Sequence, residues 1–218
     1  GKGSMTHDKK IRAVLFDFDM TLVDSSYAIH HCTNLLANHL GFKEISREEV
    51  LSAIGMTIED SWRMFWGDFR QEWVDFYRAN YREEEQSRLK FFPNTTSTLE
   101  NLRSMGIKVG VVSNRRYARR PVEYMGLTPM LDVVVGLEDV ERAKPQPDSL
   151  LKGFGILGLS PSEGFYAGDT DIDMMTTVAA GCRGIGLTTG NFNGRALKEA
   201  GAWHVMDDLG EIPSLFVE

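Results

Sequence analysis

The stretch VLFDFDMTLVD, residues 14–24, decides the fold of this chain. An apolar run over residues 11–16 ends in two carboxylates spaced two apart, Asp17 and Asp19, with a hydroxyl at Thr21. Residues two apart in an extended segment point to the same side, so the two carboxylates converge at the end of a buried strand. Two like charges at the edge of a core are costly unless a cation or a proton separates them. The pair therefore predicts a divalent-metal and acid–base site.

The length and the net charge of the chain limit the classes of protein to which it can belong. The chain has 218 residues, 42% of them hydrophobic, which suffices for one sizeable core or for a core with a smaller insert. A formal net charge of −7 argues against nucleic acid or a membrane surface as a partner. One basic run departs from this balance and is interpreted as a solvated helix face. It comprises Arg115, Arg116, Arg119 and Arg120.

Cysteine usage and hydropathy do not indicate a secreted or membrane protein. Cys32 and Cys182 have no metal-ligand spacing and do not make a disulfide framework. The first predicted strand follows no apolar segment typical of a signal peptide, and no run approaches the roughly 20 residues that span a bilayer. A soluble, cytoplasmic protein is expected.

Short apolar runs alternate with helical patterns along most of the chain, which predicts a parallel sheet with crossover helices. Continuous apolarity is typical of strands buried on both faces. The predicted strands lie at residues 11–16, 107–112, 131–136, 164–168, 182–187 and 203–206. The predicted helices between them lie at residues 95–105, 147–157 and 171–180, with a short turn at 160–163.

The segment over residues 25–90 breaks this rhythm and is predicted to be all helical. Aromatic residues recur in it at steps of three and four, which indicates an apolar stripe that packs between helices. They are Trp62, Phe65, Trp66, Phe69, Trp73 and Phe76. The fold class is therefore α/β: a Rossmann-like parallel-sheet core over residues 8–24 and 91–218, with an all-helical cap domain inserted after the first strand.

The distinctive polar residues all follow predicted strands. Ser113 and Asn114 end the second strand, Asp169 ends the fourth, Asp173 lies four residues further on, and Lys144 lies in the loop AKPQPD. Ligands of doubly wound sheets bind beyond the carboxyl ends of the strands. These residues are therefore expected to meet the first carboxylate pair at one edge of the sheet.

This set of side chains suits phosphoryl transfer. Asp17, Asp169 and Asp173 supply hard oxygen ligands of the kind that Mg²⁺ prefers. An anionic carboxylate nucleophile repels a phosphate ester, so catalysis needs positive charge, which Mg²⁺ and Lys144 can supply. A second carboxylate, Asp19, could protonate the leaving oxygen and then deprotonate the attacking water.

Four motifs in order carry a resemblance to a known family. They are DFDMT, VVSN, the lysine of AKPQPD, and GDTDID, each after a predicted strand. The chain resembles the haloacid dehalogenase-like (HAD) hydrolase superfamily, in its phosphoglycolate phosphatase and β-phosphoglucomutase-like branch with a helical cap. The likeness covers nearly the whole chain, and it implies a Mg²⁺-dependent phosphatase.

The resemblance also implies roles for individual residues. Asp17 would be the nucleophile and Asp19 the general acid–base, and Lys144 would pair with the nucleophile and the phosphate. The phosphate-binding positions would be Thr21, Ser113, Asn114 and Lys144. The metal would be held by Asp17, the backbone carbonyl of Asp19, Asp169, and Asp173 directly or through water.

Two positions depart from the family pattern, and one cap loop is a candidate for specificity. Met20 and Asn94 stand where the family usually has glycine, and Met20 would be strained if its φ were positive. The loop Gly55, Met56 and Thr57 interrupts the helical pattern of the cap and resembles a substrate-facing loop. A simple interhelical turn is the other interpretation. Cap opening near residues 24–25 and 92–93 is expected to admit substrate.

Alternative functions remain open at this point. The first is a phosphatase acting on a small phosphomonoester, with phosphoglycolate as the first guess and pyrophosphate or sugar phosphates close behind. The second is a β-phosphoglucomutase-like phosphomutase on a sugar phosphate, and the third is a non-catalytic binding protein on the same scaffold. A dehalogenase is disfavoured because such enzymes resemble this fold but lack the carboxylate at position 19. The expected partner is a small phosphorylated metabolite, and the protein is expected to be a monomer or homodimer.

Overall fold

Six parallel strands form the central sheet of the computed structural model, which describes residues 10–216. The strands are β1 (Ala13–Phe16), β4 (Lys108–Val112), β5 (Val133–Val135), β6 (Gly164–Gly168), β7 (Arg183–Leu187) and β8 (His204–Met206). Their order is β5-β4-β1-β6-β7-β8, with β1 hydrogen-bonded to β4 on one side and to β6 on the other. The six apolar runs of the sequence are therefore the six strands, and the predicted α/β class is confirmed.

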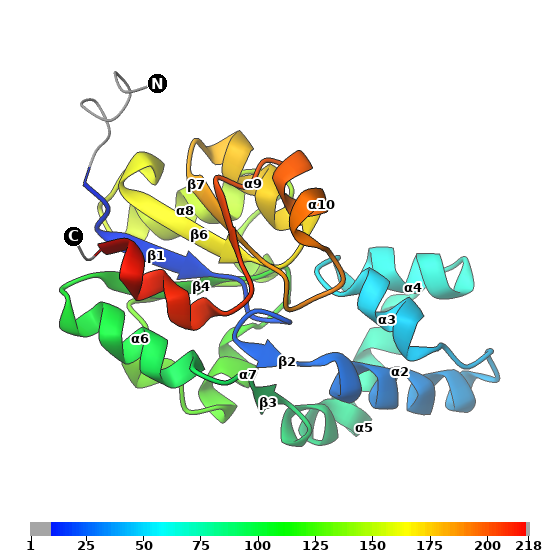
Figure 1. Ribbon diagram of the computed structural model, residues 1–218. Helices are drawn as coiled ribbons and strands as arrows, with labels where there is room; N and C mark the ends of the chain where they lie inside the picture. Colours follow the sequence, from blue (N-terminus) through cyan, green and yellow to red (C-terminus); the bar gives the residue numbers. More distant parts are fainter. Residues whose placement is uncertain (1–9, 217–218) are drawn as a thin grey trace.

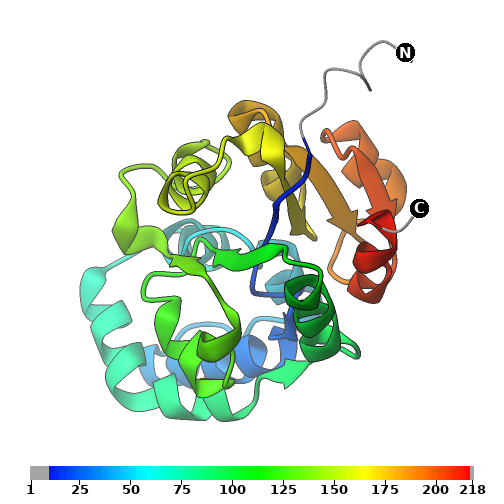
Figure 2. The same cartoon turned by 90° about the vertical axis from the view of Figure 1, so that its left-hand side faces the viewer.

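Helices cover both faces of this sheet (Figures 1 and 2). They are α6 (Thr95–Ser104), α7 (Arg119–Tyr124), α8 (Asp148–Ile156), α9 (Asp171–Ala180) and α10 (Gly194–Glu199), with 3₁₀ helices η1 (Thr128–Met130), η2 (Leu137–Asp139), η3 (Pro161–Glu163) and η4 (Leu209–Phe216). Alternate residues of β1 enter two cores. Val14 and Phe16 pack in the cluster that contains Leu99 of α6, whereas Leu15 packs with Phe154 of α8. Burial on both faces explains the unbroken apolar runs.

Four helices between β1 and the rest of the sheet form the cap, at the right of Figure 1. They are α2 (Ser26–Leu40), α3 (Arg47–Ala53), α4 (Ile58–Trp66) and α5 (Gln71–Ser87). The aromatic stripe packs between them in one cluster with Cys32 and Leu36 of α2. It does not lie on one helix, because Gly67 ends α4 with a φ of 74° and α5 begins at Gln71. The sequence pattern missed this break.

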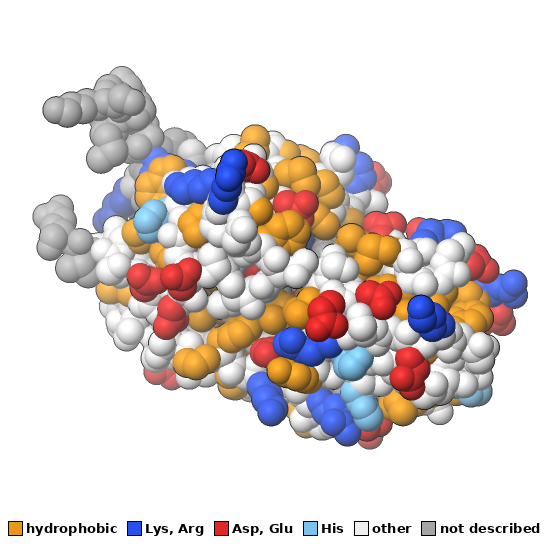
Figure 3. Space-filling model, turned by 45° about the vertical axis from the view of Figure 1, so that its right-hand side comes forward, with side chains coloured by type: hydrophobic (Ala, Val, Ile, Leu, Met, Phe, Trp, Pro, Cys, Tyr) orange, Lys and Arg blue, Asp and Glu red, His pale blue; other side chains and the backbone are white. Residues whose placement is uncertain are grey.

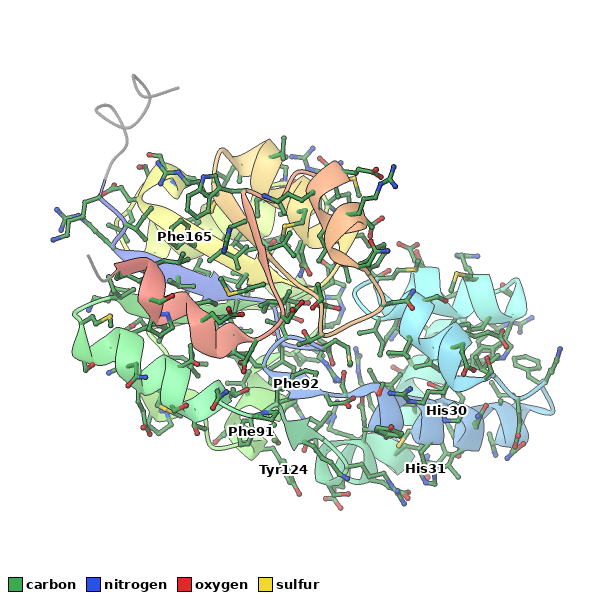
Figure 4. The ribbon with its side chains drawn as sticks, in the orientation of Figure 1. His30, His31, Phe91, Phe92, Tyr124 and Phe165 are labelled. Carbon is green, nitrogen blue, oxygen red and sulfur yellow. The ribbon has the colours of Figure 1, made fainter. Side chains whose placement is uncertain are left out.

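A two-stranded antiparallel ribbon joins the cap to the core. It pairs β2 (Val23–Asp24) with β3 (Lys90–Phe91), which the sequence analysis did not predict. Figure 4 places Phe91 and Phe92 at this junction. The division into a core domain and a cap domain stays an interpretation, and positions 8 and 9 of the predicted core lie outside the described residues.

Three further features concern the surface charge, the helix lengths and the cysteines. Basic and acidic side chains are interspersed over the face shown in Figure 3. Within residues 10–216, no helix is long and apolar enough to cross a membrane. Both cysteines, Cys32 and Cys182, are buried free thiols.

Candidate active site

The carboxyl ends of the strands bring the polar residues together as their spacing predicted. Asp17 follows β1, Ser113 follows β4, Lys144 lies in the loop after β5, and Asp169 follows β6, with Asp173 in the first turn of α9. All five are buried. One oxygen from each of Asp17, Asp169 and Asp173 lies within 4.8 Å of the others. The loops therefore bring the carboxylates together in one compact site beside the ammonium group of Lys144.

The two carboxylate oxygens of Asp17 differ in their hydrogen bonds. Its Oδ1 accepts a hydrogen bond from the Phe18 backbone N–H at 2.8 Å and lies 3.3 Å from Lys144 Nζ. Its Oδ2 is buried and has no hydrogen-bond partner among the described residues. Burial, together with the carboxylates of Asp173 and Asp19, raises the pKa of Asp17 to about 7 despite Lys144. A buried, unpartnered carboxylate oxygen is costly unless a ligand completes it.

Lys144 is held by three side chains at the centre of the site. Its Nζ donates to Asp173 Oδ1 at 2.7 Å and to the Tyr166 hydroxyl at 2.8 Å, besides its contact with Asp17. Burial alone would lower the pKa of Lys144, but the carboxylates of Asp17 and Asp173 raise it above its usual value. The lysine is therefore an ammonium ion that offsets the negative charge of Asp17 and Asp173. Tyr166 was not predicted as a site residue, because it lies within an apolar strand and no sequence pattern marks it.

Asp173 holds the site together and has little capacity left for a metal. Its Oδ2 accepts from the backbone N–H groups of Asp169 and Thr170 at 3.1 and 3.2 Å, and from the Thr170 hydroxyl at 2.9 Å. Its Oδ1 already accepts from Lys144 and Tyr166. Of the two arrangements expected for Asp173, this favours contact with a metal through water.

Asp169 is placed by a hydroxyl and by a glycine. Its Oδ1 accepts a hydrogen bond from Thr21 Oγ1 at 3.1 Å, so Thr21 orients a carboxylate here. A Cβ at Gly190 would collide with Asp169 Oδ2, and no sequence pattern marked that glycine. Burial and the neighbouring carboxylates of Asp17 and Asp173 raise the pKa of Asp169 well above its usual value.

The donor set fits a divalent metal ion. Its candidate ligand atoms are carboxylate oxygens, which suit Mg²⁺, and Asp17 Oδ2 is the unpartnered buried atom that a cation would complete. The raised pKa values of Asp17 and Asp169 arise from crowded negative charge, which a divalent ion would relieve. Asp17 and Asp169 are thus the side chains best placed to hold it.

Both carboxylate oxygens of Asp19 accept hydrogen bonds from an arginine. Arg115 Nε and Nη2 donate to its two oxygens at 2.7 and 2.8 Å, and Arg115 Nη2 also reaches Glu85 Oε1 of α5 at 3.1 Å. Burial would raise the pKa of Asp19, but the guanidinium holds it below its usual range. The interpretation of the basic run as a solvated helix face is wrong for Arg115, which precedes α7 and bridges core and cap. It holds for Arg119, which is exposed and pairs with Asp139.

Ser113 and Asn114 make contacts within the protein. Ser113 Oγ accepts from the Arg115 backbone N–H at 3.0 Å. Asn114 Nδ2 donates to the carbonyls of Lys144 and Gly55, and its Oδ1 accepts from the Lys144 N–H. Asn114 therefore ties the lysine loop and the cap loop to β4, and both of its polar atoms are in use.

The cap loop reaches the site. Gly55 has a φ of 109°, and a Cβ there would lie 3.0 Å from Thr170 Cγ2. Gly55 and Met56 line a cavity of about 130 Å³ between cap and core, together with Asp19, Asn114 and Arg115. Thr57 lies outside this lining and instead caps α4, accepting from the Asp60 N–H.

Both departures from the family pattern fall at positions with positive φ. Met20 has a φ of 61° and Asn94 a φ of 72°. Asn94 Nδ2 donates to Asp208 Oδ2 at 2.9 Å, which anchors the start of α6. Met20 is buried beside Ile45, Val50 and Ile54 of the cap, so its side chain joins core to cap at the cost of a strained backbone.

A parallel sheet whose strand ends converge on buried carboxylates and one buried lysine defines a Rossmann-like α/β protein with an acidic site, and known proteins identify its family. The family described as haloacid dehalogenase-like hydrolase matches residues 14–187, and the chain belongs to this family. A phosphoglycolate phosphatase from Aquifex aeolicus is 32% identical over 176 residues, covering 79% of this chain and 83% of that protein. Pyrophosphatase PpaX from Bacillus mycoides is 31% identical over 196 residues, covering 88% and 89%.

A solved structure supports the same assignment. A protein from Bacteroides fragilis, described as a haloacid dehalogenase-like hydrolase, superposes with a TM-score of 0.85 at 30% identity. The alignment covers 93% of this chain and all of that one.

Proposed function

We propose that this protein is a Mg²⁺-dependent phosphatase that hydrolyses a small phosphomonoester through a phospho-Asp17 intermediate. The observation that carries the proposal is the unpartnered Oδ2 of Asp17, buried beside the Lys144 ammonium and the carboxylate of Asp169. Relatives named as phosphoglycolate phosphatase and as pyrophosphatase support this class of substrate.

The proposed first step transfers the phosphoryl group to the protein. A carboxylate oxygen of Asp17 attacks phosphorus, the bond from phosphorus to the leaving oxygen breaks, and Asp19 gives its proton to that oxygen. Lys144 reduces the repulsion between the carboxylate and the phosphate because its ammonium touches Asp17. A bound divalent cation would offset charge on the transferring oxygens.

The second step releases phosphate. Asp19, now a carboxylate, accepts a proton from water as that water attacks phosphorus, and Asp17 leaves as a free carboxylate. Ser113, which follows β4 at the same edge of the sheet, would support the phosphoryl oxygens with its hydroxyl.

Asp19 must exchange its partner during this cycle. The bidentate contact with Arg115 keeps it ionised, and an ionised carboxylate cannot act as the acid of the first step. The arrangement with Arg115 on Asp19 is therefore a resting state, and substrate binding is expected to draw Arg115 away.

The test is phosphate release from a panel of small phosphoesters, with Mg²⁺ and with a chelator. The Asp17→Asn variant should lose at least ~10³-fold in kcat, because it lacks the nucleophile. Asp171→Asn is the matched control, since Asp171 lies in the same GDTDID motif but outside the acidic cluster. Full turnover by Asp17→Asn would refute the proposal. Isomerisation of a sugar phosphate without phosphate release would favour the phosphomutase instead.

A further inference from the structure

Four arginines gather at the outer end of the cavity between cap and core without a carboxylate partner. They are Arg78, Arg82, Arg116 and Arg120, and all four line the cavity. Among residues 10–216 none of them forms an ion pair, whereas Arg88 pairs with Glu84 and Arg142 with Asp148. Composition does not explain this group, because the chain has 31 acidic residues and 24 basic ones.

The four arginines lie on both sides of the boundary between cap and core. Arg78 and Arg82 lie on α5 of the cap, and Arg116 and Arg120 lie in the loop after β4 and at the start of α7. Burial lowers the pKa of Arg78, and the charges of Arg82 and Arg116 lower it further. The pKa of Arg82 is lowered by burial and by Arg120, although the carboxylate of Glu85 acts in the opposite direction. Arg78 and Arg82 are half-buried, whereas Arg116 and Arg120 are exposed. Like charges that gather in this way repel each other, so an anion between them would be stabilised.

The ring of Tyr117 contacts one arginine of the cap and one of the core. The Cζ atoms of Arg78 and Arg120 lie 5.1 and 5.8 Å from the centroid of its ring. Its φ is 62°, which is strained for an aromatic residue, and its N–H donates to Glu138 Oε1 at 2.9 Å. Strain of this kind persists where the surrounding structure demands it, as at binding sites. The loop therefore presents core arginines to cap arginines in one defined place.

The cavity connects these arginines to the reacting end of the site. Asp19 and Asn114 line its inner end, and Ile54, Trp62 and Tyr77 contribute to its walls. In the proposed first step the leaving oxygen takes its proton from Asp19, so the leaving group of a phosphoryl group that transfers to Asp17 would lie in the space that Asp19 lines. A volume of about 130 Å³ admits on the order of ten waters, so the leaving group is small.

The acidic residues nearby leave the arginines free to bind an anion. Glu85 is engaged with Arg115. Glu83 and Glu123 line a neighbouring depression together with Arg78, Arg82 and Arg120, but within the described chain neither glutamate forms an ion pair with these arginines.

We propose that Arg78, Arg82, Arg116 and Arg120 bind an anionic group carried by the leaving group. The preferred substrates are then small phosphomonoesters or phosphoanhydrides with a second anionic group. This inference rests on the proposed phosphatase function and assigns the far end of the same cavity. Carboxylate and phosphate both accept paired hydrogen bonds from guanidinium groups, so the shared chemistry is an oxyanion.

The experiment compares three substrates that differ in the leaving group. 2-Phosphoglycolate carries a carboxylate, inorganic pyrophosphate carries a phosphate, and 2-hydroxyethyl phosphate carries a neutral hydroxyl. The unmodified enzyme with Mg²⁺ should have a kcat/KM about 10- to 100-fold higher for one of the two anionic substrates than for the neutral one. Which anion is preferred identifies its source.

Two variants locate the effect. In the double variant Arg78→Gln with Arg120→Gln, kcat/KM for the anionic substrate should fall at least about 10-fold more than for the neutral one. Arg88→Gln is the matched control, because Arg88 ends the same helix α5 and pairs with Glu84 away from the cavity. It should keep the full preference.

Each outcome decides the proposal. Equal kcat/KM for neutral and anionic substrates in the unmodified enzyme overturns it, and this comparison needs no variant to fold. A loss of preference in Arg88→Gln as large as in the double variant overturns it as well. If the enzyme releases phosphate from none of these compounds, the phosphatase proposal fails, and the subsite is judged by thermal shift instead. Pyrophosphate should then stabilise the protein more than inorganic phosphate does, and an equal shift in the double variant overturns the subsite.

Discussion

Met20 provides the sharpest test of how the core holds the cap. Its side chain is only 4% exposed and packs against Ile45, Val50 and Ile54, while its backbone has a φ of 61°. Two replacements separate the packing from the backbone. Met20→Ala removes the packing and keeps a Cβ in the left-handed region, whereas Met20→Gly removes the packing and also relieves the backbone.

The magnitudes give a definite order. Removing a buried methionine side chain lowers the free energy of unfolding by about 2–5 kcal/mol. A Cβ at a positive φ costs about 1 kcal/mol that glycine avoids. The expected order of stability is therefore unmodified protein, then the glycine variant, then the alanine variant, with about 1 kcal/mol between the two variants.

Urea unfolding monitored by tryptophan fluorescence measures this order. The control is Ala79→Gly in the exposed middle of α5, where glycine should be about 1 kcal/mol less favourable than alanine. The sign of the difference between glycine and alanine is thus opposite at the two positions. An alanine variant at position 20 as stable as the glycine variant would refute the backbone argument. Unchanged stability in both would refute the packing argument.

Three further predictions concern the acidic site. In the metal-free protein, Asp17 has a pKa raised from 3.8 to about 7, so the folded state holds a proton that the unfolded chain releases. The contribution of this proton to stability is complete below about pH 4 and is lost as pH rises through 7. Because a metal ion binds the deprotonated carboxylate, the gain in Tm on adding Mg²⁺ should grow from pH 5 to pH 8. A gain in Tm that does not change with pH would contradict this. Gly190→Ala should weaken Mg²⁺ binding at least about 10-fold, measured by calorimetry, because its Cβ collides with Asp169; unchanged affinity would exclude that contact. Arg115→Gln removes the cation that lowers the pKa of Asp19 in the free enzyme, so the descending limb of the kcat/KM–pH profile should move to higher pH; a shift to lower pH would rule out Asp19 as the acid.

Much of the fold was predictable because the sheet is buried on both faces. Each strand then needs a continuous apolar run, and the runs predicted all six strands to within two residues at each end. Parallel strands also send their carboxyl ends to one edge, so Asp17, Lys144 and Asp169 could be expected to meet. The short β2–β3 ribbon was not predicted, because strands of two residues are too short to show an alternating hydrophobic pattern.

Contacts between distant segments could not be predicted in the same way. Arg115 reaches Asp19 across 96 positions and Glu85 across 30, and a run of arginines is usually a solvated surface. Tyr166 was indistinguishable from its apolar neighbours, although its hydroxyl joins Lys144 to Asp173. Such residues act through partners that only the folded chain supplies.

The sequence by itself determined the class of fold, the order of the four motifs and the chemistry of their side chains, because burial and strand direction leave local patterns. The tertiary structure alone decided the unequal surroundings of the carboxylates. It leaves Asp17 Oδ2 without a partner, gives both oxygens of Asp19 to Arg115, and saturates Asp173 with hydrogen bonds. The physical reason is that the state of a carboxylate depends on burial and on neighbouring charge, and both are properties of the assembled chain.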